Sequence, residues 1–250
     1  MGLMRNRVAL VTGASRGIGA ATAKLLGQHG TAVGVNFHGN LAAAQSVVEA
    51  IEAEGGKAIP VQADVKDEAQ LEKIVQQVSE VFGPIDTLVL NASASFVTAP
   101  FLEYQWSDFE TKVLSELKSV FYPIKAVVRS MVEKQQGCII AVSSMASRYP
   151  SEGLCAHSTA KSGLDAFVKS LALELGPHGI RVNVVAPGWI ATDQTASQPQ
   201  EFKDMMRKMT PLQRNGLPED VAGSILMLAS DAARFITGAY IPVCGGAQML

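Results

Sequence analysis

The sequence predicts a doubly wound α/β fold, a parallel β-sheet with helices on both faces, in one domain that spans residues 1–250. Short apolar runs alternate with longer amphipathic ones, which is typical of strand–helix–strand units with right-handed crossovers. The strand candidates are continuously apolar, so both of their faces are expected to be buried. A chain of 250 residues is long enough for one such domain with a large core.

The predicted elements follow one another in a regular order. Apolar runs predict strands over 7–12, 31–36, 57–62, 85–91, 137–144, 180–187 and 239–243, and amphipathic runs predict helices over 17–29, 40–54, 67–82, 107–134, 156–175 and 218–229. Gly55-Gly56 and Gly83-Pro84 end the second and third helices. The stretch 191–215 departs from the alternation, because it is long and rich in methionine, and we interpret it as a lid or substrate loop.

Composition narrows the classes of partner. The net charge of −2 gives a nucleic-acid partner no electrostatic support. The three cysteines are odd in number and show neither CxxC nor Cys/His metal spacing, so we expect free thiols in a reducing compartment and no metal site. The N-terminus runs directly into a strand pattern, and no apolar run reaches the length of a membrane span. A cytoplasmic protein without a membrane partner is expected.

The segment VTGASRGIGAA joins the first predicted strand to the first predicted helix and contains Gly13, Gly17 and Gly19. Glycine permits a tight turn and a close approach of the backbone to phosphate. The helix start beyond it offers free N–H groups and a positive dipole end to a pyrophosphate. Because this turn opens a strand–helix–strand series, it predicts a dinucleotide site of the Rossmann type.

The end of the second strand, VNFHGN, bears on the choice of dinucleotide. An acidic residue there would bind the ribose hydroxyls and repel a 2′-phosphate. This chain has Asn36 and no carboxylate at that point. Ser15 and Arg16 lie in the glycine turn and can meet a 2′-phosphate, the arginine through a charge-assisted hydrogen bond. NADP(H) is therefore predicted over NAD(H).

These residues resemble the short-chain dehydrogenase/reductase family, and within it the 3-oxoacyl-thioester reductases, over essentially the whole chain. The stretches that carry the resemblance are TGASRGIG, Asp64-Val65, LNAS at 90–93, Ser144, Lys161, PGWIATD at 187–193 and the run from Gly216 to Gly246. The resemblance implies that Ser144 and Lys161 are catalytic and that Lys161 also holds the cofactor ribose. It implies further cofactor contacts from Ile18, Asn91, Pro187, Gly188, Ile190 and Thr192, a carbonyl or acyl-thioester substrate, and a homotetramer.

The chain departs from the family pattern at two catalytic positions. The family tyrosine lies four residues before the lysine, where this chain has His157, and the family asparagine of the long helix is replaced by Glu116. Ser93 and Cys244 are two further departures, beside the cofactor and near the C-terminus. His157 and Lys161 share a helix face at i and i+4. We hypothesise that His157 donates the proton and that Glu116 is its charge partner, because a nearby carboxylate stabilises an imidazolium.

Other interpretations of the same residues stay open. Some dienoyl-thioester reductases of this family lack the tyrosine and use an acid in the long helix, which here would be Glu116. The protein can also be a cofactor-binding protein without redox activity. His157 can be a structural residue of its helix, and Glu116 a solvated partner of Lys112. Further candidates are Tyr149 as a hydroxyl donor or substrate contact, and Trp106, Trp189, Met205, Met206 and Met209 as an apolar substrate wall.

Overall fold

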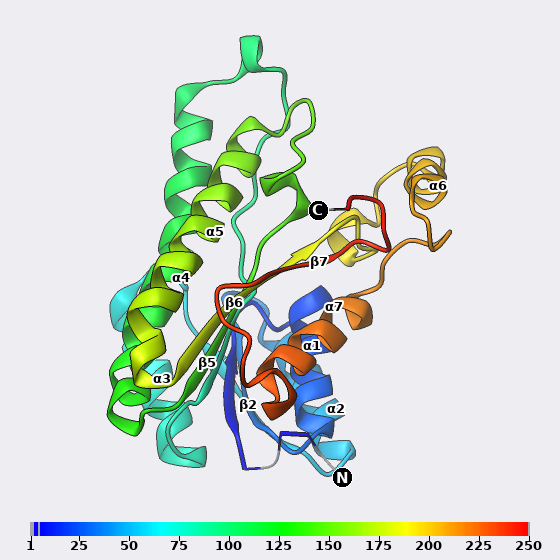
Figure 1. Ribbon diagram of the computed structural model, residues 1–250. Coiled ribbons are helices and arrows are strands. Elements are labelled where there is room, and N and C mark those ends of the chain that lie inside the picture. The colour runs from blue at the N-terminus through cyan, green and yellow to red at the C-terminus, as the bar shows by residue number, and fades with distance from the viewer. Residues whose placement is uncertain (1–2, 5, 250) are drawn as a thin grey trace.

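Seven parallel strands form one sheet in the order β3-β2-β1-β4-β5-β6-β7 (Figure 1). The computed structural model describes residues 3–4 and 6–249. The strands are β1 (Val8–Val11), β2 (Ala32–Phe37), β3 (Lys57–Gln62), β4 (Thr87–Leu90), β5 (Gly137–Val142), β6 (Ile180–Pro187) and β7 (Tyr240–Val243). The chain order reverses between β1 and β4, and the loops after such strands open a crevice at the carboxyl edge of the sheet.

Helices cover both faces of the sheet, which explains why the strands are continuously apolar. One face is covered by α1 (Gly17–Gln28), α2 (Leu41–Ala53) and α7 (Pro218–Ala229), and the other by α3 (Glu68–Phe82), α4 (Trp106–Lys134) and α5 (Cys155–Leu175). Each layer has its own apolar cluster, with Leu26, Ile51 and Ile225 in the first and Leu71, Ile124 and Leu164 in the second. The predicted fold class is confirmed.

The start of α1 differs from the starts of α2 and α3. Asn40 caps α2 by accepting from the Ala43 N–H at 3.0 Å, and Asp67 caps α3 by accepting from the Gln70 N–H at 3.1 Å. The N-cap residue of α1 is Arg16, whose side chain makes no capping hydrogen bond. The first-turn N–H groups of α1 therefore lack a side-chain cap, as a helix start that receives an anion requires.

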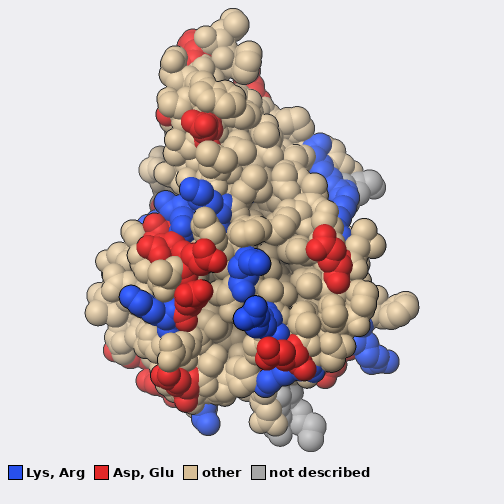
Figure 2. Space-filling model, turned by 90° about the vertical axis from the view of Figure 1, so that its left-hand side faces the viewer, with Lys and Arg blue, Asp and Glu red and all other residues tan. Residues whose placement is uncertain are grey.

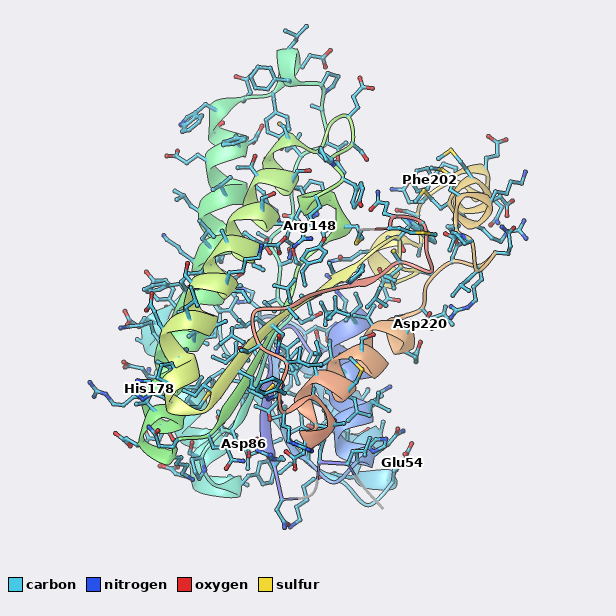
Figure 3. The ribbon with its side chains drawn as sticks, viewed as in Figure 1. Glu54, Asp86, Arg148, His178, Phe202 and Asp220 are labelled. Carbon is cyan, nitrogen blue, oxygen red and sulfur yellow. The ribbon has the colours of Figure 1, made fainter. Side chains whose placement is uncertain are left out.

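Two segments extend beyond the sheet (Figure 1). The start of α4 and the turn before it, with a 3₁₀ helix at Phe101–Glu103, project past the carboxyl edge. The predicted lid, 191–215, contains a 3₁₀ helix at Asp193–Thr195 and the helix α6 (Gln200–Met209). Phe202 of α6, labelled in Figure 3, packs edge-to-face on Trp189 with ring centroids 6.2 Å apart.

Within residues 3–4 and 6–249, none of the helices combines the length and the hydropathy that a membrane crossing needs. In the same part of the chain no group of histidine, cysteine and acidic side chains is arranged to hold a metal ion. Cys138, Cys155 and Cys244 are free thiols.

Candidate active site

A cleft of about 870 Å³ lies at the carboxyl edge of the sheet. It receives residues from the glycine turn, from the loops after β2, β3 and β4, from the end of β5, from the first turns of α5 and from the segment after β6. All the residues predicted for the site line this cleft except two, Gly19 and Glu116. The topology thus brings together stretches that lie up to about 180 residues apart in the sequence (Gly13 and Thr192).

The glycine turn forms a cradle that side chains would fill. Gly13 and Gly17 have φ angles of +61° and +55°, which favour glycine. A Cβ on Gly19 would lie 2.4 Å from the Gly13 carbonyl oxygen and 2.5 Å from Asn91 Nδ2. Gly19 therefore serves packing within the turn, while Gly13 and Gly17 face the cleft.

Asn36 and Asn91 act on the turn more than on the cleft. Asn36 is 1% exposed, its Oδ1 accepts from the Gly13 N–H at 3.1 Å, and its Nδ2 faces backbone carbonyls. Asn91 Nδ2 donates to the carbonyls of Thr12 and Gly13 at 3.0 and 3.1 Å. Asn36, predicted as a cofactor contact, lines the cleft, while its amide is hydrogen-bonded to backbone groups of the turn and of the loop after β3.

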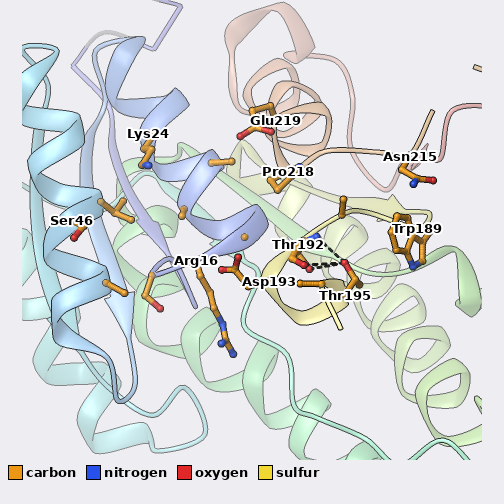
Figure 4. A pocket seen from close by; sticks show the side chains of 18 of the residues that line it. Arg16, Lys24, Ser46, Trp189, Thr192, Asp193, Thr195, Asn215, Pro218 and Glu219 are labelled. Atoms are coloured by element: carbon orange, nitrogen blue, oxygen red, sulfur yellow. Dashed lines mark hydrogen bonds between the residues drawn. The ribbon is translucent and has the colours of Figure 1, made fainter. Parts of the chain in front are cut away.

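A second hollow, of about 790 Å³, adjoins the glycine turn between α1, α2 and the segment after β6 (Figure 4). Ser15, Arg16 and Thr192 line both spaces. Arg16 extends from the start of α1 into the open (Figure 4). His38, which follows β2 directly, is exposed and lines the main cleft. His38 is not among the residues predicted from the sequence. It directly follows the second strand, at the place where the residue that distinguishes the two dinucleotides is expected, and this position is the signal that identifies it.

Lys161 is held from two sides in the buried end of the cleft. Its Nζ donates to the Val142 carbonyl at 2.7 Å and lies 2.7 Å from Glu116 Oε1. The side chain is 4% exposed. Ser144 lies in the same cleft, and its Oγ accepts from the Ala146 N–H at 3.1 Å, so the hydroxyl hydrogen remains available to a ligand.

Glu116 lies behind Lys161 and joins two lysines. Its Oε2 accepts from Lys112 Nζ at 2.5 Å and from Ser93 Oγ at 2.9 Å. Burial opposes its ionisation, but the charges of Lys161 and Lys112 outweigh burial and lower the pKa of Glu116 to about 2. The expected ion pair with Lys112 is present, yet Glu116 is fully buried, so the interpretation of a solvated helix residue is wrong.

His157 forms one wall of the cleft without the partner proposed for it. Its ring stacks on Phe96 with centroids 4.3 Å apart, and its Nδ1 is buried without a hydrogen-bond partner. Burial and the charges of Lys161 and Lys112 lower the pKa of His157 to about 4, against a weaker opposing effect of Glu116. Glu116 thus raises the pKa of His157, as hypothesised, but its ion pairs are with Lys112 and Lys161, and the charges of these lysines outweigh its effect on the imidazole.

Most of the remaining candidates lie away from the cleft, and the exceptions are Trp189 and Ser93. The Tyr149 hydroxyl donates to the Met249 carbonyl and does not reach the cleft. Trp106 is 70% exposed at the start of α4, where it stacks on Phe109. The methionines of α6 also lie outside the lining, so only Trp189 of the proposed apolar wall reaches the cleft. Cys244 lies elsewhere too, and Ser93 lines the cleft above Glu116.

A parallel sheet with a glycine turn at its reversal point, an uncapped helix start and a Ser–His–Lys wall in one cleft defines a nicotinamide-dependent oxidoreductase. A family model described as "Enoyl-(Acyl carrier protein) reductase" matches residues 13–248. The chain belongs to the short-chain dehydrogenase/reductase family.

Relatives and solved structures agree with this assignment. The chain is 41% identical over 244 residues to a 3-oxoacyl-[acyl-carrier-protein] reductase of Synechocystis sp., with 97% of each chain covered. It is 39% identical to an L-rhamnose 1-dehydrogenase (NAD(P)(+)) of Sphingomonas sp., with 98% of each covered. A dehydrogenase/reductase from Sinorhizobium meliloti superimposes with a TM-score of 0.89 at 34% identity, covering 98% of this chain and 96% of that one.

Proposed function

We propose that the protein is an NADPH-dependent oxidoreductase that reduces a carbonyl group, in a 3-oxoacyl thioester or a related ketone. The observation that carries the proposal is the single cleft that joins the glycine turn and the uncapped start of α1 to Ser144, His157 and Lys161. The relative named as a 3-oxoacyl-[acyl-carrier-protein] reductase supports the thioester.

The residues fit a nicotinamide dinucleotide. The space beside Gly17 is open, since a Cβ there would meet nothing closer than Thr192 at 3.7 Å, and the nearby N–H groups of α1 suit a pyrophosphate. Arg16 and His38 border the part of the cleft after β2, where Phe37 is buried and no carboxylate stands. Positive or neutral side chains can bind a 2′-phosphate when no nearby carboxylate repels it. This arrangement supports NADP(H) as the cofactor.

The bound cofactor supplies a hydride to the carbonyl carbon. The carbonyl oxygen then gains charge and needs a hydrogen-bond donor and a proton. Ser144 donates the hydrogen bond without changing its own charge. His157 gives the proton from its imidazolium form, and Lys161, fixed by Val142 and Glu116, binds the ribose and adds positive charge to the oxygen's surroundings.

The protonation state of His157 bears on whether it can act as an acid or as a base. With a pKa of about 4, its imidazole is neutral near pH 7 and ready to accept a proton. This favours a second candidate function, the oxidation of an alcohol with His157 as general base, and the relative named as a sugar dehydrogenase supports it. The dienoyl-type alternative with Glu116 as acid is weaker, because two lysines keep that carboxylate ionised.

Measured rates with NADPH and a panel of ketoacyl, enoyl and dienoyl thioesters test the proposal. The imidazolium fraction of His157 falls tenfold per pH unit above its pKa of about 4, so kcat/KM for ketone reduction should fall from pH 5.5 to 8. Alcohol oxidation, measured with NADP⁺ as the hydride acceptor, should be independent of pH over this range. Replacing His157 by Phe should lower both rates by about 10²- to 10⁴-fold. Wild-type rates in that variant would refute the role, and tight NADPH binding without any turnover would favour a non-redox protein.

Three further features belong to the proposal. The segment 191–215 acts as a lid, in which Phe202 holds Trp189 beside the cleft. The enzyme works in the cytoplasm, which the three free thiols support. It assembles as a homotetramer through α4 and α5, where Leu114, Phe121 and Leu173 are 49%, 45% and 81% exposed.

A further inference from the structure

Lys112 is a buried lysine with no part in the chemistry described above. Its side chain is 1% exposed, and it does not line the cleft. It belongs to the stripe of α4 that faces the core, which continues through Glu116 to Val120, Ile124 and Val127. Packing alone calls for apolar residues there, because a buried ion pair is rarely more stable than an apolar replacement. The charges at 112 and 116 therefore call for a reason other than the fold.

The contacts of Lys112 connect it to the surroundings of Lys161 and of His157. Its Nζ donates to Glu116 Oε2 at 2.5 Å, to the Ala94 carbonyl at 2.8 Å and to Ser93 Oγ at 3.2 Å. All three ammonium hydrogens are used, and two of these contacts secure the loop after β4. The same Nζ lies 5.3 Å from the centroid of the Phe96 ring.

We propose that Lys112, which cannot reach substrate, is a positioning residue for Lys161 and His157. It acts on Lys161 through Glu116, whose second oxygen lies 2.7 Å from Lys161 Nζ. It acts on His157 through its charge, and it also lies 5.3 Å from the centroid of the Phe96 ring on which the imidazole stacks. The value of this positioning for catalysis rests on the proposed function, whereas the contacts themselves do not.

The charges around His157 make the proposal measurable. Lys161 lies on the same helix, Lys112 and Glu116 lie on α4, and the loop after β4 adds Ser93, Ala94 and Phe96 without a charge. Asp64 and Asp193 line the cleft farther along. The three charged groups next to His157 sum to +1. Removing Lys112 alone leaves a sum of zero, whereas removing Lys112 and Glu116 together restores +1.

The experiment compares wild type, Lys112→Met and the double variant K112M/E116M. NMR of the histidine rings follows the pKa of His157, with His157→Phe identifying its signal among the four histidines. The pKa of His157 should rise by about one unit in Lys112→Met and return to within about half a unit of wild type in the double variant. Exposed Lys118 of the same helix provides the matched control, and Lys118→Met should titrate as wild type.

Fluorescence titration with NADPH and thermal unfolding complete the test. Lys112→Met should bind NADPH about tenfold more weakly, because Glu116 loses one of its two lysine partners and Lys161 loses its fixed support, whereas Lys118→Met should bind as wild type. The double variant leaves the buried Lys161 ammonium without its carboxylate, so its Tm should fall by about 5–10 °C. Wild-type NADPH affinity in folded Lys112→Met overturns the role toward Lys161. An unchanged His157 titration in Lys112→Met overturns the role toward His157, even if the double variant does not fold. The His157 titration and the NADPH titration can both be measured even if the protein turns over no thioester. A failure of the proposed function is therefore distinguishable from a failure of this proposal.

Discussion

Glu116 and His157 show that the chemistry of a side chain is decided by its neighbours. Both were recognised in the sequence as departures from a family pattern, and i,i+4 spacing placed His157 beside Lys161 correctly. The sequence could not tell which partner would take the Glu116 carboxylate. A Lys–Glu pair at i,i+4 has the same sequence spacing whether it is solvated or buried. Here Lys112 and Glu116 are both buried.

The depressed pKa of His157 makes folding stability depend on pH. The unfolded chain binds a proton near pH 6.5, whereas the folded chain does so only near pH 4. Between these values the unfolded state gains protons first, so the free energy of unfolding should fall as pH drops from 6.5 to 4, by on the order of 3 kcal/mol. Denaturant titrations at several pH values measure this. His157→Phe should lack this component, and an equal slope in both proteins would contradict the burial of the ring.

Arg16 is expected to select the cofactor. Replacing Arg16 by Ala removes one charge-assisted hydrogen bond to a 2′-phosphate, so the Kd for NADPH should rise about 10- to 100-fold while the Kd for NADH changes less than about threefold. Lys24 lines only the second hollow, and Lys24→Ala is the matched control. An equal rise in Kd for NADPH and for NADH would show that the 2′-phosphate does not bind at Arg16.

At the scale of elements, the start of α1 depends on the close packing of its glycines. Gly19→Ala would place a Cβ 2.4 Å from a carbonyl oxygen of the same turn, so the turn must shift and NADPH binding should weaken by more than tenfold. Gly223 of α7 has nothing within 4 Å of its Cβ position and serves as the control. Gly223→Ala should leave the NADPH Kd unchanged and raise the stability by about 0.5–1 kcal/mol. Fluorescence titration and denaturant unfolding distinguish the two variants.

The strands and helices could be predicted because burial on both faces leaves an unambiguous pattern. The helix predicted over 218–229 is α7 itself, and the one predicted over 107–134 begins one residue earlier. The segment 191–215 was harder. Its helix α6 carries Phe202, Met205, Met206 and Met209 at helical spacing, yet none of its residues is buried, so the helix does not pack on the core of the domain.

At the scale of the whole molecule, one side is suited to self-association. Figure 2 shows that the upper half of the face that carries α4 and α5 has few charged side chains. Phe121 of α4 is 45% exposed and stacks on Phe167 of α5 at 6.1 Å. Phe121→Glu would bury a charge in the proposed interface and should yield particles smaller than a tetramer in light scattering. Lys73→Glu on α3 is the control, and a tetramer in both would move the interface elsewhere.

Arg148, labelled in Figure 3, lies over the Tyr240 ring at 3.7 Å and joins the loop after β5 to the last strand. The Tyr149–Met249 contact secures the end of the chain against the same loop. The loop that follows Ser144 is thus tied to residues about 100 positions later, which local sequence patterns cannot reveal.

The buried Lys112–Glu116 pair also has a consequence for ancestry. Either residue alone would leave a charge with one partner fewer inside the protein, so Lys112 and Glu116 are expected to be inherited together. Among related chains, an acidic residue at the position of Glu116 should be accompanied by a lysine one helical turn earlier. That K-x-x-x-E signature would mark a subgroup from sequence alone, before any member of it is assayed.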